Sequence, residues 1–128
     1  MCLFCDIVAD KIPSKKVYED DRCIAILDIS QATYGHTLVI PKQHFDNFLT
    51  CDSETLAHLF QVSQILARQI TTNCKADGCN IVVNTNEAAG QSVMHLHIHI
   101  IPRYVNDDYK MVGTPHQYDL NEVLQKIL

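Results

Sequence analysis

The chain has 128 residues, of which 47% are hydrophobic and 20% charged, as is typical of one globular domain. Ten basic and fifteen acidic residues give a formal net charge of −5, which argues against long-range attraction to nucleic acid or an anionic membrane. The sequence has no apolar run of membrane-spanning length and no signal-peptide pattern, so we expect a single cytoplasmic domain over residues 1–128.

Short strands are predicted in the first third of the chain, at residues 16–19, 22–29 and 36–41. The second is rich in isoleucine and is expected to be buried. The third follows Gly35 and ends at Pro41, which cannot continue a hydrogen-bonded ladder.

The main helix is predicted from Ser53 to about residue 73, because apolar side chains recur there at helical spacing and Asp52 or Ser53 can cap it. A short second helix is predicted at 120–128. Asp119 can cap it, and its leucines need another surface to pack on.

Two more strands, at 80–84 and 94–101, are separated by a polar loop of about eight residues at 85–92 and are expected to form an antiparallel hairpin. The strands do not alternate regularly with helices. The pattern therefore predicts an α+β fold with a mainly antiparallel sheet.

Three histidines, His95, His97 and His99, alternate along the last predicted strand. Their imidazoles would share one face, while Leu96 and its apolar neighbours at 98 and 100 would face the core. Like charges held close together disfavour protonation, and the neutral imidazole is the form that attacks electrophiles and binds metals. This spacing indicates a functional site, whereas one histidine would indicate only a wet strand face.

The segment just upstream, Gly90-Gln91-Ser92, offers flexible backbone and polar donors that could hold a phosphate. We therefore expect Gly90 and Gln91 to bind substrate, although such a segment also makes an ordinary loop.

Two of the six cysteines form a motif that suggests a functional role. Without a secretion signal the thiols are expected to stay reduced. Cys2 and Cys5 form a C-x-x-C pair, which is half of a tetrahedral zinc site. The others are interpreted as packing residues: Cys23, Cys51, Cys74 and Cys79.

The run from Gly90 to Ile101 resembles the signature of the histidine-triad (HIT) nucleotide hydrolases and transferases. The likeness extends through residues 27–30 and 35–42 and spans most of the chain before Val105. It implies the HIT-like fold, with a five-stranded, mainly antiparallel sheet, one long helix and a short C-terminal helix.

The resemblance also implies roles for individual residues. His97, as the middle histidine of the triad, would attack the α-phosphorus of a nucleotide, and water would then hydrolyse the nucleotidyl-histidine. Asp28 would bind the ribose hydroxyls, and His36 would orient the triad. Phe4, Ile7 and Ile29 would wall the base, and Asn84, Ser92 and His99 would hold the phosphate, with His36, Ser92 and His99 joining His97 as catalytic residues.

Bacterial-type members close to the Hint subfamily that carry the cysteine pair complete a zinc site with two histidines. The matching positions imply a site of Cys2, Cys5, His44 and His95. Four protein ligands leave no open position for water, so this Zn²⁺ would be structural. No organic cofactor is expected.

Two other interpretations stay open. In a metallohydrolase, His95, His97 and a distant histidine such as His36 would bind a catalytic zinc that generates hydroxide. In a nucleotide-binding adaptor, the pocket would bind its ligand and turnover would be incidental. Loss of activity with chelator and the absence of a covalent adduct would favour the first, and binding without turnover the second.

By resemblance, the favoured substrates are purine nucleoside phosphoramidates or aminoacyl adenylates rather than dinucleoside polyphosphates, with an AMP-like product. A homodimer that joins two sheets is also implied, and the apolar residues of 120–128 could add to that contact. Residues 105–118 match no pattern that we can assign. In the family this segment often shapes the side of the pocket that holds the leaving group, so the sequence does not define the leaving group. His58 and His116 are interpreted as surface histidines.

Overall fold

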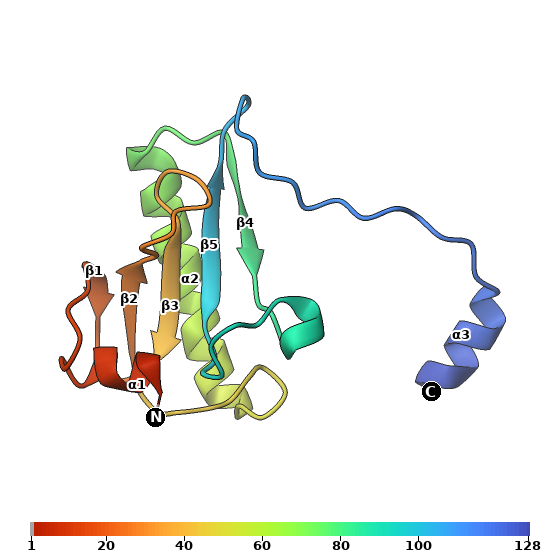
Figure 1. The fold of residues 1–128 in the computed structure, drawn as a ribbon, viewed down its shortest axis with the longest axis horizontal. Helices are drawn as coiled ribbons and strands as arrows, with labels where there is room; N and C mark the ends of the chain where they lie inside the picture. The colour runs from red at the N-terminus through yellow and green to blue at the C-terminus, as the bar shows by residue number, and fades with distance from the viewer. Residues whose placement is uncertain (1) are drawn as a thin grey trace.

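A computed structural model describes residues 2–128 and contains one five-stranded sheet with the strand order β1-β2-β3-β5-β4 (Figure 1). Every neighbouring pair is antiparallel, which confirms the predicted α+β fold. The strands are β1 (Lys16–Glu19), β2 (Cys23–Leu27), β3 (Thr37–Pro41), β4 (Gly78–Val82) and β5 (Ile98–Arg103).

The long helix α2 (Ser53–Asn73) and the C-terminal helix α3 (Leu120–Ile127) lie where the sequence predicts them. Asp52 caps α2 by accepting a hydrogen bond from the Thr55 backbone N–H at 2.9 Å, and Asp119 caps α3 in the same manner. A single 3₁₀ turn, η1 (Glu87–Ala89), lies between β4 and β5.

The N-terminal helix α1 (Leu3–Val8) was not predicted, because six residues are too few to show a helical period. The Cys2 sulfur caps it by accepting a hydrogen bond from the Cys5 backbone N–H at 3.3 Å. One helical turn therefore places the two sulfurs of the C-x-x-C pair side by side.

Helices cover both faces of the sheet, which explains why the central strands are buried along almost their whole length. On one face, Leu59 and Leu66 of α2 pack against Ala25 and Val39. On the other, α1 contributes Phe4 and Ile7 to a cluster with Ile24, Ile26, Leu38 and Ile40.

The histidine strand begins later than predicted, at Ile98 rather than at residue 94. The Leu96 N–H donates to the Phe45 carbonyl at 2.7 Å, and the Pro41 carbonyl accepts from the His95 side chain at 2.9 Å, so these groups are not available for ladder pairing. The β4–β5 connection therefore spans residues 83–97 and is longer than the predicted loop.

β5 also continues past residue 101, the predicted end of this strand, through Pro102 to Arg103. Pro102 pairs with Cys79 of β4, but the pairing of β5 with β3 stops at Ile100. The missing N–H of Pro102 therefore breaks no ladder bond to β3.

Two side chains lie in different surroundings from those predicted. His58 is only partly exposed, and its Nε2 lies 2.7 Å from Asp20, so it is not an unpartnered surface histidine. Cys79 is exposed on β4 and is not a packing residue, unlike the buried Cys23. All six cysteines are free, and His116 is exposed as expected.

Residues 105–128 form a C-terminal arm that leaves the end of β5 and extends beyond β4, carrying α3 away from the sheet (Figure 1). Every residue from Met111 to Leu128 is exposed. Within residues 2–128, none of the helices combines the length and apolar character needed to cross a bilayer.

Candidate active site and metal centre

A cavity next to α1 is lined by most of the residues that the sequence analysis proposed for substrate binding. α1 supplies its apolar wall, and the β2 end supplies a carboxylate. The proposed residues that line it are Phe4, Ile7, Asp28, Ile29, Ser92, His97 and His99.

The predicted alternation of the triad segment is confirmed, even though only His99 lies within β5. Leu96, Ile98 and Ile100 are buried in the core cluster beneath α2. His99 pairs with Leu38 of β3 and faces the α1 side, and the ring of His97 meets the Phe4 ring edge-on with centroids 4.9 Å apart. The Phe4 ring therefore forms an apolar wall beside the triad histidines.

One hydrogen bond fixes the tautomer of His97. Its Nδ1 lies 2.8 Å from the His95 backbone carbonyl, which can only accept, so Nδ1 carries the proton and Nε2 keeps a free lone pair. Burial lowers the pKa of His97, although the bond to the carbonyl opposes this shift. At neutral pH the imidazole is uncharged and able to act as a nucleophile.

A second chain of hydrogen bonds fixes His99. The Ala32 N–H donates to His36 Nδ1 at 3.1 Å, so the neutral His36 ring carries its proton on Nε2 and donates it to His99 Nδ1 at 2.9 Å. His99 then carries its own proton on Nε2. Burial, with the neighbouring rings of His97 and His36, lowers the pKa of His99 to about 4.

Asp28 lies beside this chain without joining it by a hydrogen bond. One carboxylate oxygen accepts a hydrogen bond from the Ser30 N–H at 2.8 Å, and the other lies 3.6 Å from His36 Nε2. The carboxylate lines the cavity with lone pairs left for hydroxyl donors.

Three of the proposed substrate-binding residues do not line the cavity: Asn84, Gly90 and Gln91. Gln91 is buried, accepts a hydrogen bond from the Asn86 N–H and donates to the carbonyls of Asp46 and Val93. The Gln91 side-chain amide therefore stabilises the conformation of the β4–β5 connection. Gly90 has φ +96°, a left-handed conformation that strains any residue with a Cβ.

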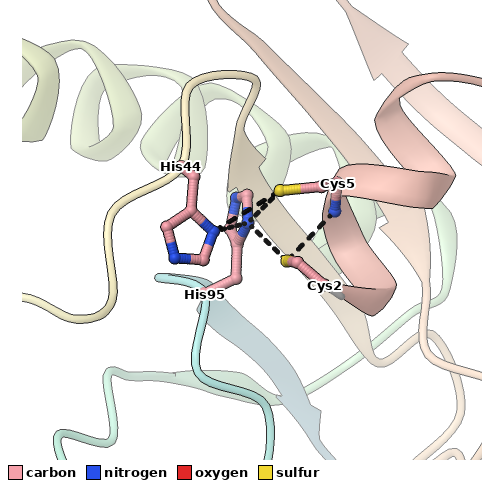
Figure 2. Close-up of side chains that lie close together, drawn as sticks. All are labelled: Cys2, Cys5, His44 and His95. Atoms are coloured by element: carbon pink, nitrogen blue, oxygen red, sulfur yellow. Dashed lines mark hydrogen bonds between the residues drawn. The ribbon is translucent and has the colours of Figure 1, made fainter.

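The four residues proposed as zinc ligands converge on one point (Figure 2). The Nδ1 atom of His95 lies 3.1 Å from the Cys2 sulfur, 3.5 Å from the Cys5 sulfur and 3.1 Å from His44 Nδ1. Tetrahedral zinc with S and N ligands places neighbouring ligand atoms roughly 3.3–3.8 Å apart, so the cluster is close to the size that this ion needs.

The outer nitrogens of His44 and His95, the two histidines proposed as ligands, are already bonded. His95 Nε2 donates to the Pro41 carbonyl at 2.9 Å, and His44 Nε2 donates to the Asp46 carboxylate at 2.8 Å. Both Nδ1 atoms therefore present lone pairs to the two sulfurs. Such a donor set is stable with a cation at its centre, and two thiolates with two neutral imidazoles suit zinc.

The two sulfurs differ in acidity. Burial opposes ionisation of Cys2, but hydrogen bonds from the Cys5 backbone N–H and the Cys5 thiol lower the pKa of Cys2 overall. Burial, together with the neighbouring Cys2, raises the pKa of Cys5 to about 11. Cys2 is therefore the sulfur that ionises first.

Sequence reasoning missed the groups that orient these side chains. The carbonyls of Pro41 and His95 carry no side-chain signal. Asp46 could have been found, because an acid two residues after a proposed ligand is within reach of its ring. Ser14 and Val93 line the cavity as well: Ser14 belongs to a loop without a motif, and Val93 lies within the Gly90–Ile101 run but was given no role.

Comparison with known proteins agrees with this geometry. The family model described as HIT domain matches residues 9–106. The chain belongs to the HIT family. It is 47% identical to the protein hit of Bacillus subtilis over 98% of this chain and 88% of that protein. It is also 38% identical to adenylylsulfatase HINT3 of Arabidopsis thaliana, over 83% of this chain and 54% of that protein.

Solved structures of HIT relatives show the same fold. A Streptococcus mutans protein superposes with a TM-score of 0.92 at 48% identity, covering 98% of this chain and 80% of that chain. A zinc-bound histidine triad family protein from Mycobacterium smegmatis superposes with a TM-score of 0.82 at 40% identity, covering 90% and 84%. The chain therefore has the HIT fold. Its family is one of nucleotide-binding hydrolases and transferases.

Proposed function

We propose that this HIT protein cleaves purine nucleoside phosphoramidates, or related nucleotides, at the α-phosphate through a nucleotidyl-histidine intermediate on His97. The observation that carries the proposal is the hydrogen bond from His97 Nδ1 to the His95 carbonyl, which leaves Nε2 unprotonated in a cavity. A neutral imidazole is a good nucleophile and a good leaving group.

The two steps balance without a redox partner. In the first, the Nε2 lone pair of His97 bonds to the α-phosphorus, the phosphorus–nitrogen bond breaks, and the amine leaves with that electron pair and takes a proton from solvent. In the second, water attacks phosphorus and gives up a proton to solvent, the bond to Nε2 breaks, and AMP is released with the imidazole restored.

The proposal also gives roles to the other cavity residues. The Nε2–H of His99, which points away from His36, is a donor for a phosphate oxygen, as is the Ser92 hydroxyl. Asp28 would accept hydrogen bonds from the ribose hydroxyls, and Phe4, Ile7 and Ile29 would enclose the base.

Cys2, Cys5, His44 and His95 would hold a structural zinc ion that ties α1 to the loops after β3 and before β5. A zinc-bound relative from Mycobacterium smegmatis supports this assignment. The ion would complete the wall of the cavity, because α1 supplies Phe4 and Ile7.

The geometry counts against a metallohydrolase built on His95, His97 and His36. Nδ1 of His95 faces the cysteines and its Nε2 is bonded to Pro41, so His95 has no nitrogen left to share a metal with His97. His36 also has both nitrogens committed, to Ala32 and His99. The nucleotide-binding adaptor would have the same pocket as the proposed enzyme, so only a measurement of turnover distinguishes the two.

The test is to incubate wild-type protein and a His97→Ala variant with adenosine 5′-monophosphoramidate and to follow AMP release and the mass of acid-quenched protein. We expect AMP and an adenylyl adduct with the wild type, and neither with the variant. Activity lost to chelator while no adduct forms would favour the metallohydrolase, and binding without AMP release would favour the adaptor. His116→Ala, in the exposed arm, is the matched control.

The proposal includes a purine nucleotide as the substrate, a cytoplasmic location, and no binding to nucleic acid or membrane. The net charge of −5 and the local, mostly neutral donors of the cavity support the choice of a small ligand over a polyanion.

A further inference from the structure

The C-x-x-C pair is arranged so that its two sulfurs can also bond to each other. Cys2 is the N-cap of α1, and Cys5 lies about one helical turn later. One turn separates Cα atoms by roughly 5 Å, within the range of about 4.4–6.8 Å that a disulfide spans. The two sulfurs lie within 4.8 Å of each other and both point toward His44 and His95 (Figure 2). The pair can therefore close into a disulfide with little movement of the backbone.

The sulfur pair is also within reach of small molecules. Cys2 is only partly buried and lines a cavity of about 560 Å³ together with Leu3, His44 and Met94. Cys5 is partly buried as well, but it does not line this cavity. Cys2 is therefore the thiol that a small oxidant meets first, and Cys5 is placed to react with it afterwards.

A disulfide and the proposed zinc ion exclude each other, because both need the same two sulfurs. The thiolate is the form of cysteine that binds a metal, and a disulfide removes both thiolates. His44 and His95 would remain, but they are only half of the four ligands that a structural zinc site needs. Formation of the disulfide therefore releases the ion.

Release of zinc would also act on the neighbouring nucleotide cavity, because α1 forms its apolar wall. The Phe4 ring, between the two cysteines in sequence, meets the rings of His95 and His97 edge-on, with centroids 5.9 and 4.9 Å apart. Leu3 lines both cavities. A helix of six residues depends on such external contacts for its stability. Without the metal, this wall loses its attachment to the loops that carry both histidine ligands.

We propose that Cys2 and Cys5 form a redox couple that a hydroperoxide oxidises to a disulfide, releasing zinc and loosening α1 at the nucleotide cavity. The inference rests on the zinc site of the proposed function and not on the chemistry at His97. In a reducing compartment disulfides are transient and serve catalysis or sensing. The protein then binds its nucleotide tightly only while the pair is reduced.

The oxidation balances with the hydroperoxide as the electron acceptor. The Cys2 thiolate attacks a peroxide oxygen, the O–O bond breaks, and the alkoxide or hydroxide that leaves takes a proton from solvent, so that Cys2 becomes a sulfenic acid. The Cys5 thiolate then attacks the Cys2 sulfur and expels hydroxide, which solvent protonates to water. Two electrons pass from the sulfurs to the peroxide, and a thiol reductant returns them by exchange.

The first test treats zinc-loaded, full-length protein with a small molar excess of hydrogen peroxide and follows zinc with a chromogenic chelator and the intact mass of the chain. A Cys79→Ser background removes the exposed cysteine. We expect one zinc ion released per chain, a mass lower by two hydrogens, a Cys2–Cys5 link in the peptide map, and recovery of zinc binding after reduction. Cys51→Ser in the same background is the matched control and should behave identically.

Zinc that stays bound in peroxide, or zinc released while the chain only gains oxygen atoms, would overturn the proposal. Protein that holds no zinc before peroxide is added would contradict the zinc assignment itself, and the redox proposal with it. The two failures are therefore distinguished by the step at which they are seen.

The second test asks whether oxidation loosens α1. The Asp6 and Ala9 amides donate to the carbonyls of Cys2 and Cys5, so their hydrogen exchange reports on this helix. We expect both amides to exchange at least about tenfold faster after oxidation, with the amides of α2 unchanged, and AMP to bind about tenfold more weakly. Equal exchange in both forms would overturn the link to the cavity. If AMP binds neither form, the proposed nucleotide site fails, while zinc, mass and exchange still decide the redox proposal.

Discussion

The Nε2 atom of His36 lies 2.9 Å from Nδ1 of His99, and the backbone of Ala32 fixes which of the two nitrogens carries the proton. Two histidines 63 positions apart in the chain therefore act as one hydrogen-bonded unit. In the proposed mechanism, the Nε2–H of His99 at the other end of this unit donates to the substrate phosphate.

We predict that His36→Ala lowers kcat on a nucleoside phosphoramidate by about 10–100-fold, with little change in KM, because His99 loses the partner that fixes its tautomer. His36→Gln retains a donor and should recover part of the loss. Steady-state kinetics of both variants, with His116→Ala as the control, check this. Equal kcat values for His36→Ala and wild type would rule out the orienting role.

Asp28 is predicted to recognise the ribose. In Asp28→Asn the side-chain oxygen can still accept from the Ser30 N–H, but the negative charge facing the cavity is lost. Calorimetric titration should show AMP binding weakened by roughly tenfold or more, as for a lost hydrogen bond to a charged group. Binding of 2′,3′-dideoxy-AMP should differ little between wild type and variant, and an equal loss for both ligands would place Asp28 outside ribose recognition.

The stability of the protein should depend on His99 below neutral pH. The folded state lowers the pKa of His99 from 6.5 to about 4, so between these values the unfolded chain binds a proton that the folded chain excludes. The contribution of His99 is therefore fully present above pH 6.5 and is lost as pH falls toward 4. Urea unfolding of His99→Gln should show a shallower decline than wild type over this range, whereas His116→Gln should match wild type.

Metal loading should stabilise the N-terminus. Chelator treatment, or Cys2→Ser, is expected to lower the Tm, because α1 then loses its tie to His44 and His95. Asp46→Asn should weaken zinc binding by about 10–100-fold, since Asp46 orients His44. Zinc content by mass spectrometry and competition with a chelator measure both effects. Cys51→Ser, outside the cluster, should bind zinc as tightly as wild type.

Much of the fold could be predicted because its signals are local and periodic. The helix after Asp52 and the alternation of Leu96, Ile98 and Ile100 follow from side-chain spacing alone. The start of β5 could not be predicted, because it depends on a backbone bond between Leu96 and Phe45, residues far apart in the sequence.

The candidate site shows the same contrast between features that the sequence predicts and features that depend on three-dimensional contacts. The proposed residues that do line the cavity were found through motif resemblance, whereas the carbonyls that set the protonation of His95 and His97 belong to the backbone. Gln91 lies within the motif but bonds only to loop backbone, so membership of a motif does not imply contact with the cavity. Tautomers come from three-dimensional contacts that no spacing rule contains.

The covalent role of His97 is tested most directly by the stereochemistry at phosphorus. The measurement uses an adenosine phosphoramidate with a chiral thio-substituted α-phosphorus, cleaved in isotopically labelled water, and assigns the configuration of the product. Two successive in-line displacements predict net retention, because each inverts the centre once. Net inversion would show one direct attack by water and would contradict the nucleotidyl-histidine intermediate.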